Sequence, residues 1–214
     1  SDARTKVEYS RLVKSHAERA LALDPNYDYA HHVLGRWHYE VATLGLGARF
    51  IVRLVYGGLP PASTAEAVQH LRRATELAPR LPSHRIELGL ALLADGQRAA
   101  AKQTLEEALR LSPSAQAALV LARAQAATDD RRGAITTLRA APATRDARLA
   151  TEVAAELAAQ LRQLGDLDGA RQVLSAALDG TVDPALEATL RRHYADVEDA
   201  AGNPVAGVTV TFAV

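Results

Sequence analysis

The chain has 214 residues, and its 25 Lys and Arg are balanced by 25 Asp and Glu, so the formal net charge is zero. This balance argues against a nucleic-acid binder, which needs a basic face to neutralise phosphates. The chain has no Cys, which excludes disulfides, thiolate nucleophiles and Cys-ligated metal centres. It is rich in Ala and Leu and only 4% aromatic, which is typical of helices that pack closely through small side chains.

A pattern of apolar, small and proline residues recurs every 34 residues. Its two clearest copies are Ala67-x3-Leu71-x2-Ala74-x4-Pro79 and Ala101-x3-Leu105-x2-Ala108-x4-Pro113, preceded by Leu34-Gly35 and Leu88-Gly89. Small residues let two antiparallel helices approach closely, and proline ends the second helix. The pattern resembles the tetratricopeptide repeat, so we predict an all-α solenoid of antiparallel helix pairs.

The expected elements follow the repeat along the chain. They are a half repeat (5–23), an expanded repeat (27–80, with an insert at 43–63), three further repeats (82–113, 114–142 and 147–182), a closing helix (184–201) and a β-prone tail (202–214). Residues 1–201 would form the solenoid. Because the chain starts in mid-repeat, helix 5–23 would expose an apolar face, and the lack of Met at residue 1 indicates a processed or excised chain. We expect a partner to cover that face, or the chain to be a piece of a longer protein.

The expanded repeat carries a distinctive set of motifs. They are His31-His32-Val33-Leu34-Gly35-Arg36-Trp37-His38-Tyr39-Glu40, an Arg-containing insert and Pro60-Pro61-Ala62-Ser63-Thr64. Together they resemble the regulator of microtubule dynamics family over residues 6–113. The resemblance implies a tetratricopeptide-like fold without catalytic residues. It also implies binding roles, which are microtubule association in some members and lipid binding and transfer at membrane contact sites in others.

The last residues depart from the helical pattern. A Gly202-Asn203-Pro204-Val205 turn precedes alternating Val208, Val210, Phe212 and Val214. This segment resembles the start of an invasin-type bacterial immunoglobulin-like repeat, and its β-branched residues favour a strand over a frayed tail or a degenerate helix. The tail and the composition favour a bacterial, exported protein, although they leave the compartment undetermined.

Tetratricopeptide repeats bind ligands along the surface lined by the first helix of each pair. Carrying those positions over gives a candidate groove of Tyr29, His32, Arg36, Tyr39, Ile86, Leu90, Leu93 and Arg123. The expanded repeat contributes a polar and aromatic end, and the next repeat contributes an apolar floor. Such a groove suits a peptide helix or an acyl chain. The alternative is that these side chains only line a surface.

The insert carries Arg49 and Arg53 one helical turn apart, flanked by Phe50, Ile51, Leu54 and Val55. We favour a short helix that packs its apolar side on the solenoid and leaves its arginines in solvent. The alternative is that the insert covers the groove. In that case Arg36, Arg49 and Arg53 would bind a phosphate or carboxylate, such as a lipid head group.

The histidines raise the question of a metal site. His31 and His38 share one helical face, but no His-Glu-x-x-His spacing is present, so we expect core histidines and no metal. His70 and His84 lie on other elements, and we expect them to add little to a metal site. Trp37 should be a packing anchor with a bonded N–H.

Enzyme signatures are absent, so we expect no catalysis and no cofactor. We interpret Asp129-Asp130 and Asp166-x-Asp168 as turn residues and helix caps. The leading interpretation is a scaffold that binds a protein or peptide partner, with no nucleic acid. Phospholipid binding or transfer through the groove and insert is one alternative. Self-assembly is another, through the exposed first helix or by donation of strand 205–214 to a neighbouring subunit.

Overall fold

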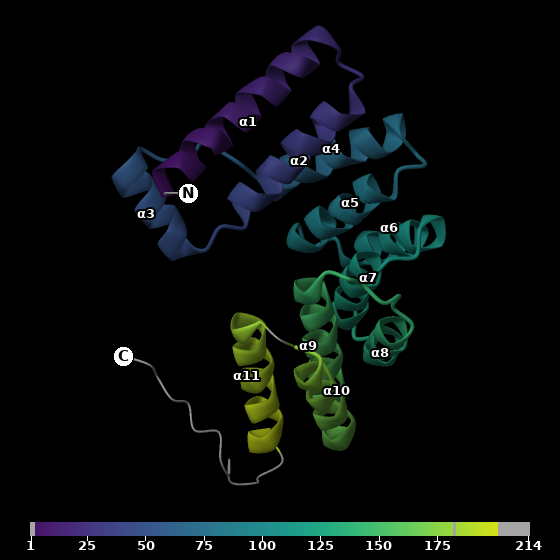
Figure 1. Ribbon diagram of the computed structural model, residues 1–214. Coiled ribbons are helices and arrows are strands. Elements are labelled where there is room, and N and C mark those ends of the chain that lie inside the picture. The colour runs from purple at the N-terminus through teal and green to yellow at the C-terminus, as the bar shows by residue number, and fades with distance from the viewer. Residues whose placement is uncertain (1–2, 182, 201–214) are drawn as a thin grey trace. The chain divides into compact units, whose positions relative to one another are not determined.

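The computed structural model describes residues 3–181 and 183–200, with the side chains of all of them except Arg49 and Tyr56. These residues form α-helices and the turns that join them, and no strand occurs within these ranges (Figure 1). No helix in the same ranges is both long enough and apolar enough to cross a membrane. The β-prone tail expected at 202–214 lies outside the described residues.

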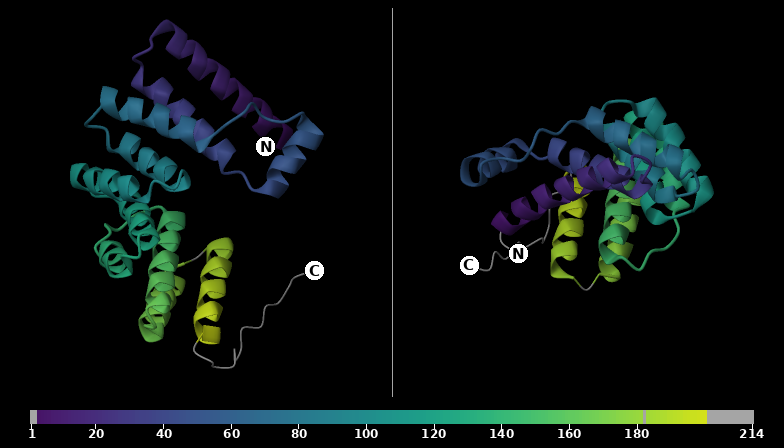
Figure 2. Two further views of the ribbon diagram at one scale, coloured as in Figure 1. Left: turned by 180° about the vertical axis from the view of Figure 1, so that it is seen from behind. Right: turned by 90° about the horizontal axis from the view of Figure 1, so that it is seen from above.

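The chain divides into two compact units, residues 1–112 and residues 113–214. The helices of the first unit are α1 (Ala3–Leu23), α2 (Asp28–Ala42), α3 (Leu46–Tyr56), α4 (Thr64–Leu77), α5 (Pro82–Ala94) and α6 (Arg98–Leu111). Helices α2 and α4 form one antiparallel pair and α5 and α6 the next, while α4 also packs on α5. Helix α3 is the insert, and Figure 2 shows it set apart from α2 and α4.

Two glycines bring the paired helices of the first unit into close contact. A Cβ atom on Gly35 would lie 2.5 Å from Cγ of Leu71, and one on Gly89 would lie 2.5 Å from Cγ of Leu105. Both leucines are completely buried. The predicted all-α, tetratricopeptide-like fold is therefore confirmed, and its small residues act where the repeat placed them.

The second unit has its own core. Its helices are α7 (Ala115–Ala127), α8 (Arg131–Arg139), α9 (Ala147–Gln163), α10 (Leu167–Asp179) and α11 (Pro184–Ala200). Helices α7 and α8 form one pair, and α9 and α10 form the next. Helix α11 packs on α9 and α10 and buries Leu190 and Val197 in a core that also holds Leu138, Leu161 and Leu174.

Aspartates cap the starts of α8, α9 and α10 in this unit. Asp130 accepts a hydrogen bond from the Gly133 amide and Asp166 accepts one from the Gly169 amide. Such caps satisfy backbone N–H groups that a helix start leaves unpaired. The expectation that these carboxylates serve turns and caps is confirmed.

Candidate functional site

The predicted groove residues, except Arg123, lie on α2 and α5, which pack against each other in the first unit. Tyr29 is 52% exposed, Leu90 and Leu93 are half-buried, and Ile86 is only 7% exposed. Arg123 belongs to α7 in the second unit. The first unit therefore offers a surface of aromatic, polar and aliphatic side chains on two adjacent helices, which we call the α2–α5 surface.

Arg36 and Arg123, the two arginines predicted to line the groove, both bind carboxylates. Nε of Arg36 donates to Glu40 at 2.9 Å, and its Nη1 donates to Glu87 at 3.2 Å. Nε of Arg123 donates to Glu156 at 3.2 Å. An anionic ligand would have to compete with these intramolecular partners for either guanidinium.

Glu87 is the buried member of this set. It is 7% exposed, and burial raises its pKa while the nearby Arg36 charge opposes that shift. The Arg36 pKa is raised in turn, first by its hydrogen bond to Glu40 and then by the Glu87 charge. The pair joins α2 to α5 within the α2–α5 surface, with Arg36 exposed and Glu87 buried.

A chain of imidazoles lies beside this ion pair. His84 is fully buried, with Nε2 3.0 Å from Oδ2 of Asp28 and Nδ1 3.0 Å from Nδ1 of His32. The hydrogen bond from His84 lowers the pKa of Asp28, and burial lowers that of His32. The Tyr29 ring stands edge-on to His84 with centroids 5.7 Å apart. This network fastens α2 to α5.

A second imidazole cluster joins α2 to α4. Nδ1 of His31 lies 3.0 Å from Nδ1 of His70, and the His70 ring stacks on His38 at 5.8 Å. His38 is 5% exposed, which confirms it as a core histidine. Helix packing brings His70 against His31 and His84 against His32, contacts that the sequence did not predict. In the described part of the chain, no three His, Asp or Glu side chains could hold a metal ion.

Trp37 ties α2 to α1. Its Nε1 donates to the backbone O and to Oγ of Ser10, each at 2.9 Å, and the ring is 5% exposed. Nζ of Lys14 lies 5.5 Å from the ring centroid, within reach of a cation–π interaction. The prediction of a packing anchor with a bonded N–H is confirmed.

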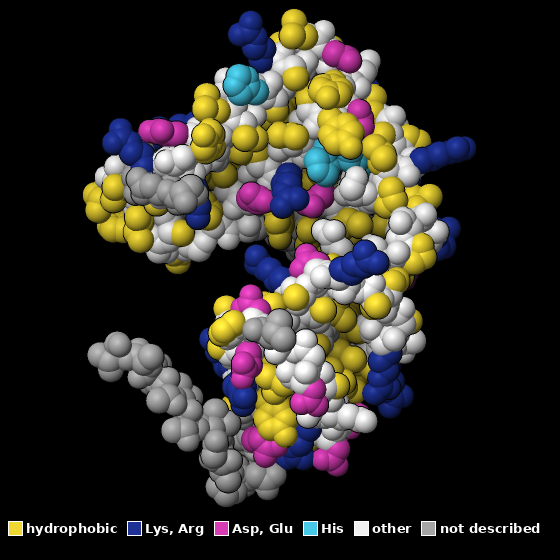
Figure 3. Space-filling view, in the orientation of Figure 1, with side chains coloured by type: hydrophobic (Ala, Val, Ile, Leu, Met, Phe, Trp, Pro, Cys, Tyr) yellow, Lys and Arg dark blue, Asp and Glu magenta, His cyan; other side chains and the backbone are white. Residues whose placement is uncertain are grey.

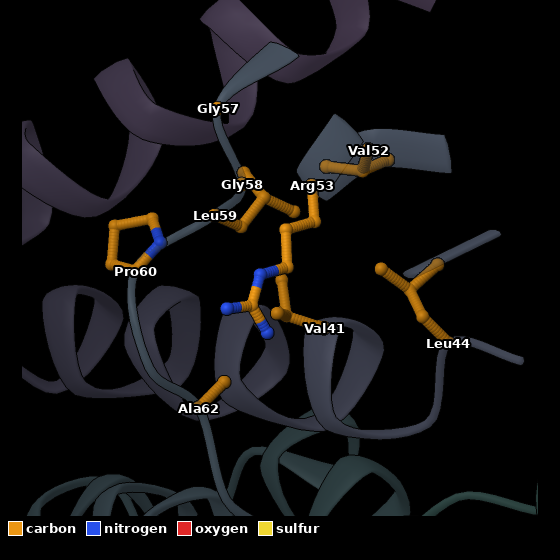
Figure 4. Close-up of a pocket in the computed structure, with 9 residues that line it drawn as sticks. All are labelled: Val41, Leu44, Val52, Arg53, Gly57, Gly58, Leu59, Pro60 and Ala62. Atoms are coloured by element: carbon orange, nitrogen blue, oxygen red, sulfur yellow. The ribbon is translucent and has the colours of Figure 1, made fainter. Parts of the chain in front are cut away.

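The insert encloses a cavity of about 430 Å³ between α3, the end of α2 and the following loop. Its lining residues are Val41, Leu44, Val52, Arg53, Gly57, Gly58, Leu59, Pro60 and Ala62. Figure 4 shows the Arg53 side chain reaching from α3 towards Val41 and Ala62. Arg36 is not part of this lining, and the Arg49 side chain is not described. Arg53 is the member of the predicted trio that the described lining contains.

The apolar side of α3 faces outward. Phe50 is 65% exposed, Leu54 73% and Val55 60%, so the expectation that this side packs on the solenoid is wrong. The chain leaves α3 through Gly57 and Gly58, whose φ angles of 75° and 84° lie in the left-handed region. This turn sets the insert apart from the α2–α4 pair instead of folding its apolar face onto it.

A hollow of about 590 Å³ lies between α1 and α2. It is lined by Tyr9, Leu12, Val13, His16, Ala17, Ala20, Tyr27, Tyr29, Ala30 and Val33, and Figure 3 shows hydrophobic side chains gathered there. Tyr9 is 63% exposed and Leu12 is 50% exposed. The expected apolar face of the first helix is therefore open.

The sequence interpretation missed Asp28, His84 and Glu87 as members of the site. A signal was present in the repeat, because His84 stands four residues before Leu-Gly, as the buried Ala30 does in the preceding pair. A histidine at a buried position needs a hydrogen-bond partner. Asp28 and His32, four residues apart on the neighbouring helix, were candidates.

Comparison with known proteins gives one family. Residues 1–130 match the model for regulator of microtubule dynamics proteins 1–3. Regulator of microtubule dynamics protein 3 of Xenopus laevis is 35% identical over 74 residues, which are 35% of this chain and 16% of that protein. Regulator of microtubule dynamics protein 1 of Rattus norvegicus is 27% identical over 85 residues, which are 40% of this chain and 27% of that protein. The chain thus covers only 16% to 27% of these relatives' length.

Solved structures share the fold. TTC0263, a thermophilic TPR protein of Thermus thermophilus, aligns with a TM-score of 0.62 and 22% identity over 86% of this chain and 88% of its own. YrrB, described as a TPR protein with an unusual peptide-binding site, aligns with a TM-score of 0.55 and 15% identity over 88% of this chain and 85% of its own. At these identities the likeness establishes the tetratricopeptide fold alone.

Proposed function

The chain belongs to the regulator of microtubule dynamics family, and from this premise we propose that it is a non-catalytic scaffold module that binds a protein partner. The observation that carries the proposal is the α2–α5 surface. It combines the exposed Tyr29 with the half-buried aliphatic Leu90 and Leu93, and aromatic and aliphatic anchors of this kind dominate peptide recognition.

The imidazole network supports a binding role over a catalytic one. Both ring nitrogens of His84 are engaged, by Asp28 and by His32. The ring is also fully buried, so no substrate reaches it. We infer that this network holds the two helices of the binding surface in a fixed arrangement, which lowers the conformational cost of binding.

A peptide is the occupant that we propose for the α2–α5 surface. YrrB is a TPR protein with a peptide-binding site, and this chain shares its fold but only 15% of its residues. The shared fold is a reason to test peptides first. The polar end at His32 and Arg36 and the apolar end at Leu90 predict a peptide with one polar and one apolar segment.

The test uses a phage-displayed library of random peptides, selected on the purified protein. Peptides that bind should lose affinity about tenfold for Leu90→Glu, because a buried unpaired carboxylate is costly. The matched control is Leu111→Glu, at an exposed position near the end of α6, which should bind as wild type. Equal binding to both variants, or no selected peptide, would contradict the proposal.

Lipid binding is a second candidate, favoured by the outward apolar side of α3 and by the cavity behind it. Phe50 and Leu54 are exposed on the helix, and Arg53 reaches into the cavity. We propose that an acyl chain would lie along α3 and that Arg53 would meet the head-group phosphate. Arg36 is left out of this version because Glu40 and Glu87 already hold it.

Organic-solvent extraction of the purified protein, followed by mass spectrometry, tests this candidate. A near-stoichiometric lipid that Arg53→Glu removes, and that Arg148→Glu retains, would support it. Arg148 is a suitable control because its exposed side chain lies on α9 in the second unit. A clean extract would leave the peptide-binding scaffold as the proposed function.

A further inference from the structure

Three side chains, Asp28, His84 and His32, form a hydrogen-bonded line that ends at the α2–α5 surface. Oδ2 of Asp28 lies 3.0 Å from Nε2 of His84, and Nδ1 of His84 lies 3.0 Å from Nδ1 of His32. His84 is fully buried, whereas His32 is half-buried. The line therefore connects a carboxylate on α2, through a buried imidazole on α5, to an imidazole at the surface.

The proton positions along this line follow from the carboxylate when both histidines are uncharged. An ionised carboxylate can only accept a hydrogen bond, so Nε2 of His84 carries a proton and donates it to Asp28. A neutral imidazole has a single N–H, so Nδ1 of His84 is bare and accepts from Nδ1–H of His32. His32 has then used its one proton, and its Nε2 is bare.

The surroundings of the line favour these charge states. The hydrogen bond from His84 lowers the pKa of Asp28, which favours the ionised carboxylate. Burial, and then the neighbouring His84 and Arg36, lower the pKa of His32, which favours an uncharged ring at neutral pH. Asp28 acts on the pKa of His32 in the other direction, but its contribution is the smallest of these.

Nε2 of His32 is available to a ligand. Among the described residues it has no hydrogen-bond partner. This nitrogen is also not enclosed, because within those residues the buried side-chain nitrogen without a partner is Nδ1 of His38. The ring of the 52% exposed Tyr29 lies beside His32, with centroids 6.2 Å apart. A peptide on the α2–α5 surface can therefore reach a hydrogen-bond acceptor next to an aromatic ring.

We propose that the line from Asp28 through His84 makes Nε2 of His32 a hydrogen-bond acceptor for the bound peptide, which supplies a neutral donor such as a Ser, Thr, Asn or Gln side chain. This inference rests on the peptide-binding function proposed for the α2–α5 surface. His32 contacts the peptide directly. Asp28 and His84 are positioning residues, because they act on the peptide through His32.

The groups around His32 select a neutral donor over a charged side chain. A carboxylate would direct its lone pairs at the bare nitrogen, and two acceptors form no hydrogen bond. Arg36 offers a carboxylate little compensation, because Glu40 and Glu87 already hold its guanidinium. A Lys or Arg side chain of the peptide would meet the like charge of Arg36, which lies close enough to act on His32.

A second imidazole pair in the same unit obeys the same proton rule with a different anchor. Nε2 of His31 lies 3.1 Å from the backbone O of Pro25, which can only accept. Nδ1 of His31 is then bare and accepts from Nδ1–H of His70 across 3.0 Å. Because this anchor is a backbone carbonyl, a substitution at Asp28 should not move the proton of His70. His70 is therefore an internal control.

Long-range 1H–15N correlation spectra of the full chain with 15N-labelled histidine show which ring nitrogen carries the proton. At pH 7.5, His32 should be in the Nδ1–H form. Asp28→Asn should convert it to the Nε2–H form. Since Asp28 also accepts from the backbone N–H of Tyr29, the introduced amide keeps its oxygen there and donates to Nε2 of His84. That donation moves the His84 proton to Nδ1 and the His32 proton to Nε2.

The matched control is Asp168→Asn, at a 96% exposed side chain on α10 in the second unit. It should leave the His32 signals unchanged, and the His70 signals should be the same in both variants. Circular dichroism checks that Asp28→Asn folds. If it does not, the wild-type spectrum and the peptides still decide.

Peptides selected on the wild-type protein from the phage-displayed library test the ligand side. They should share a neutral donor at one position, and changing that residue to glutamate should weaken binding to wild type about tenfold. On Asp28→Asn the order should reverse, because Nε2–H of His32 then donates to the carboxylate. If Asp28 only fastened α2 to α5, the variant would weaken both peptides equally and keep their order.

The outcomes separate this inference from the proposed function. Peptides that lose affinity for Leu90→Glu but keep their order on Asp28→Asn would overturn the inference and retain the peptide-binding surface. A wild-type His32 that is Nε2–H or doubly protonated at pH 7.5, or one whose proton stays on Nδ1 in Asp28→Asn, would also overturn it. If no peptide is selected, the proposed function and this inference both fail.

Discussion

His38 and His70, like His32, are held in environments that oppose their protonation. Burial lowers the pKa of His38 below its ordinary value of 6.5, although the nearby Glu66 carboxylate acts in the other direction. Burial also lowers the pKa of His70, which stacks on His38. An unfolded chain takes up these protons more readily than the folded one, so acid favours unfolding.

The free energy of unfolding should therefore fall as pH decreases from 7.5 to 5.5. Well above pH 6.5, His38 is neutral in both the folded and the unfolded chain, so the free energy of unfolding does not change there. Below pH 6.5 the unfolded chain takes up the proton first. The free energy of unfolding then falls by up to about 1.4 kcal/mol per pH unit for each histidine. Urea unfolding followed by Trp37 emission measures the slope, since Trp37 is the only Trp.

The variant His38→Gln should reduce that pH slope, and the exposed His16→Gln should keep it. Burial raises the pKa of Glu87, which acts with the opposite sign at lower pH, so the comparison uses the difference between variants at each pH. A His38→Gln slope equal to that of wild type would show that this histidine does not contribute.

Gly35 lies where α2 packs closely against α4. A Cβ atom there would lie 2.5 Å from Cγ of Leu71 and 3.1 Å from the Ala67 carbonyl oxygen. Although Ala has the higher helix propensity, we expect Gly35→Ala to destabilise the protein by about 1–3 kcal/mol through overpacking. Gly47→Ala, where nothing lies within 4 Å, should not destabilise. Urea midpoints from Trp37 emission compare the two.

At the scale of elements, α3 differs from the helices on either side of it. Helices α2 and α4 bury several side chains each, whereas α3 leaves Leu46, Phe50, Ile51, Leu54 and Val55 exposed. A helix of this length is marginal in water without tertiary packing. The stability of α3 therefore depends on few contacts with the rest of the unit.

Amide hydrogen exchange should report this difference directly. We expect the amides of α3 to exchange at least about tenfold faster than those of α4, because local opening of a poorly packed helix costs little free energy. Helix α4 is the matched reference, since it is close in length and belongs to the same repeat. Equal protection of both helices would contradict the expectation and would point to a covering contact on α3.

At the scale of the whole molecule, each compact unit has its own buried core. The first unit centres on residues such as Leu71, Leu92 and Leu105, and the second on Leu174 and Leu190. Units with separate cores can fold as separate units. We therefore expect two unfolding steps, of which only one changes the Trp37 emission.

The variant Leu174→Ala tests this expectation. Removing a fully buried leucine should destabilise the second unit by about 2–5 kcal/mol. Circular dichroism at 222 nm should show an earlier urea transition for part of the helix signal, while the Trp37 midpoint stays at its wild-type value. If the urea midpoint of Trp37 emission is lower in Leu174→Ala than in wild type, the two units unfold together.

The fold class and most of the local detail were predictable from the repeat pattern. Ala, Leu and Gly at repeat spacing, with Pro79 and Pro113 after the second helices, predicted antiparallel pairs, and the seams at Gly35 and Gly89 formed as expected. Trp37 and the capping aspartates were also predicted correctly. These features succeed because each depends on helical periodicity or on backbone chemistry within a few residues.

Which distant side chains meet was not predictable from the repeat pattern, because it depends on how the helices pack. His84 pairs with Asp28 and His32 because α5 packs on α2, and His70 reaches His31 because α4 does. The outward apolar side of α3 follows from the turn at Gly57 and Gly58, whereas its periodicity alone suggested inward packing. Pairings of this kind depend on crossing angles and on the volume of every packed side chain between two helices, which no local pattern specifies.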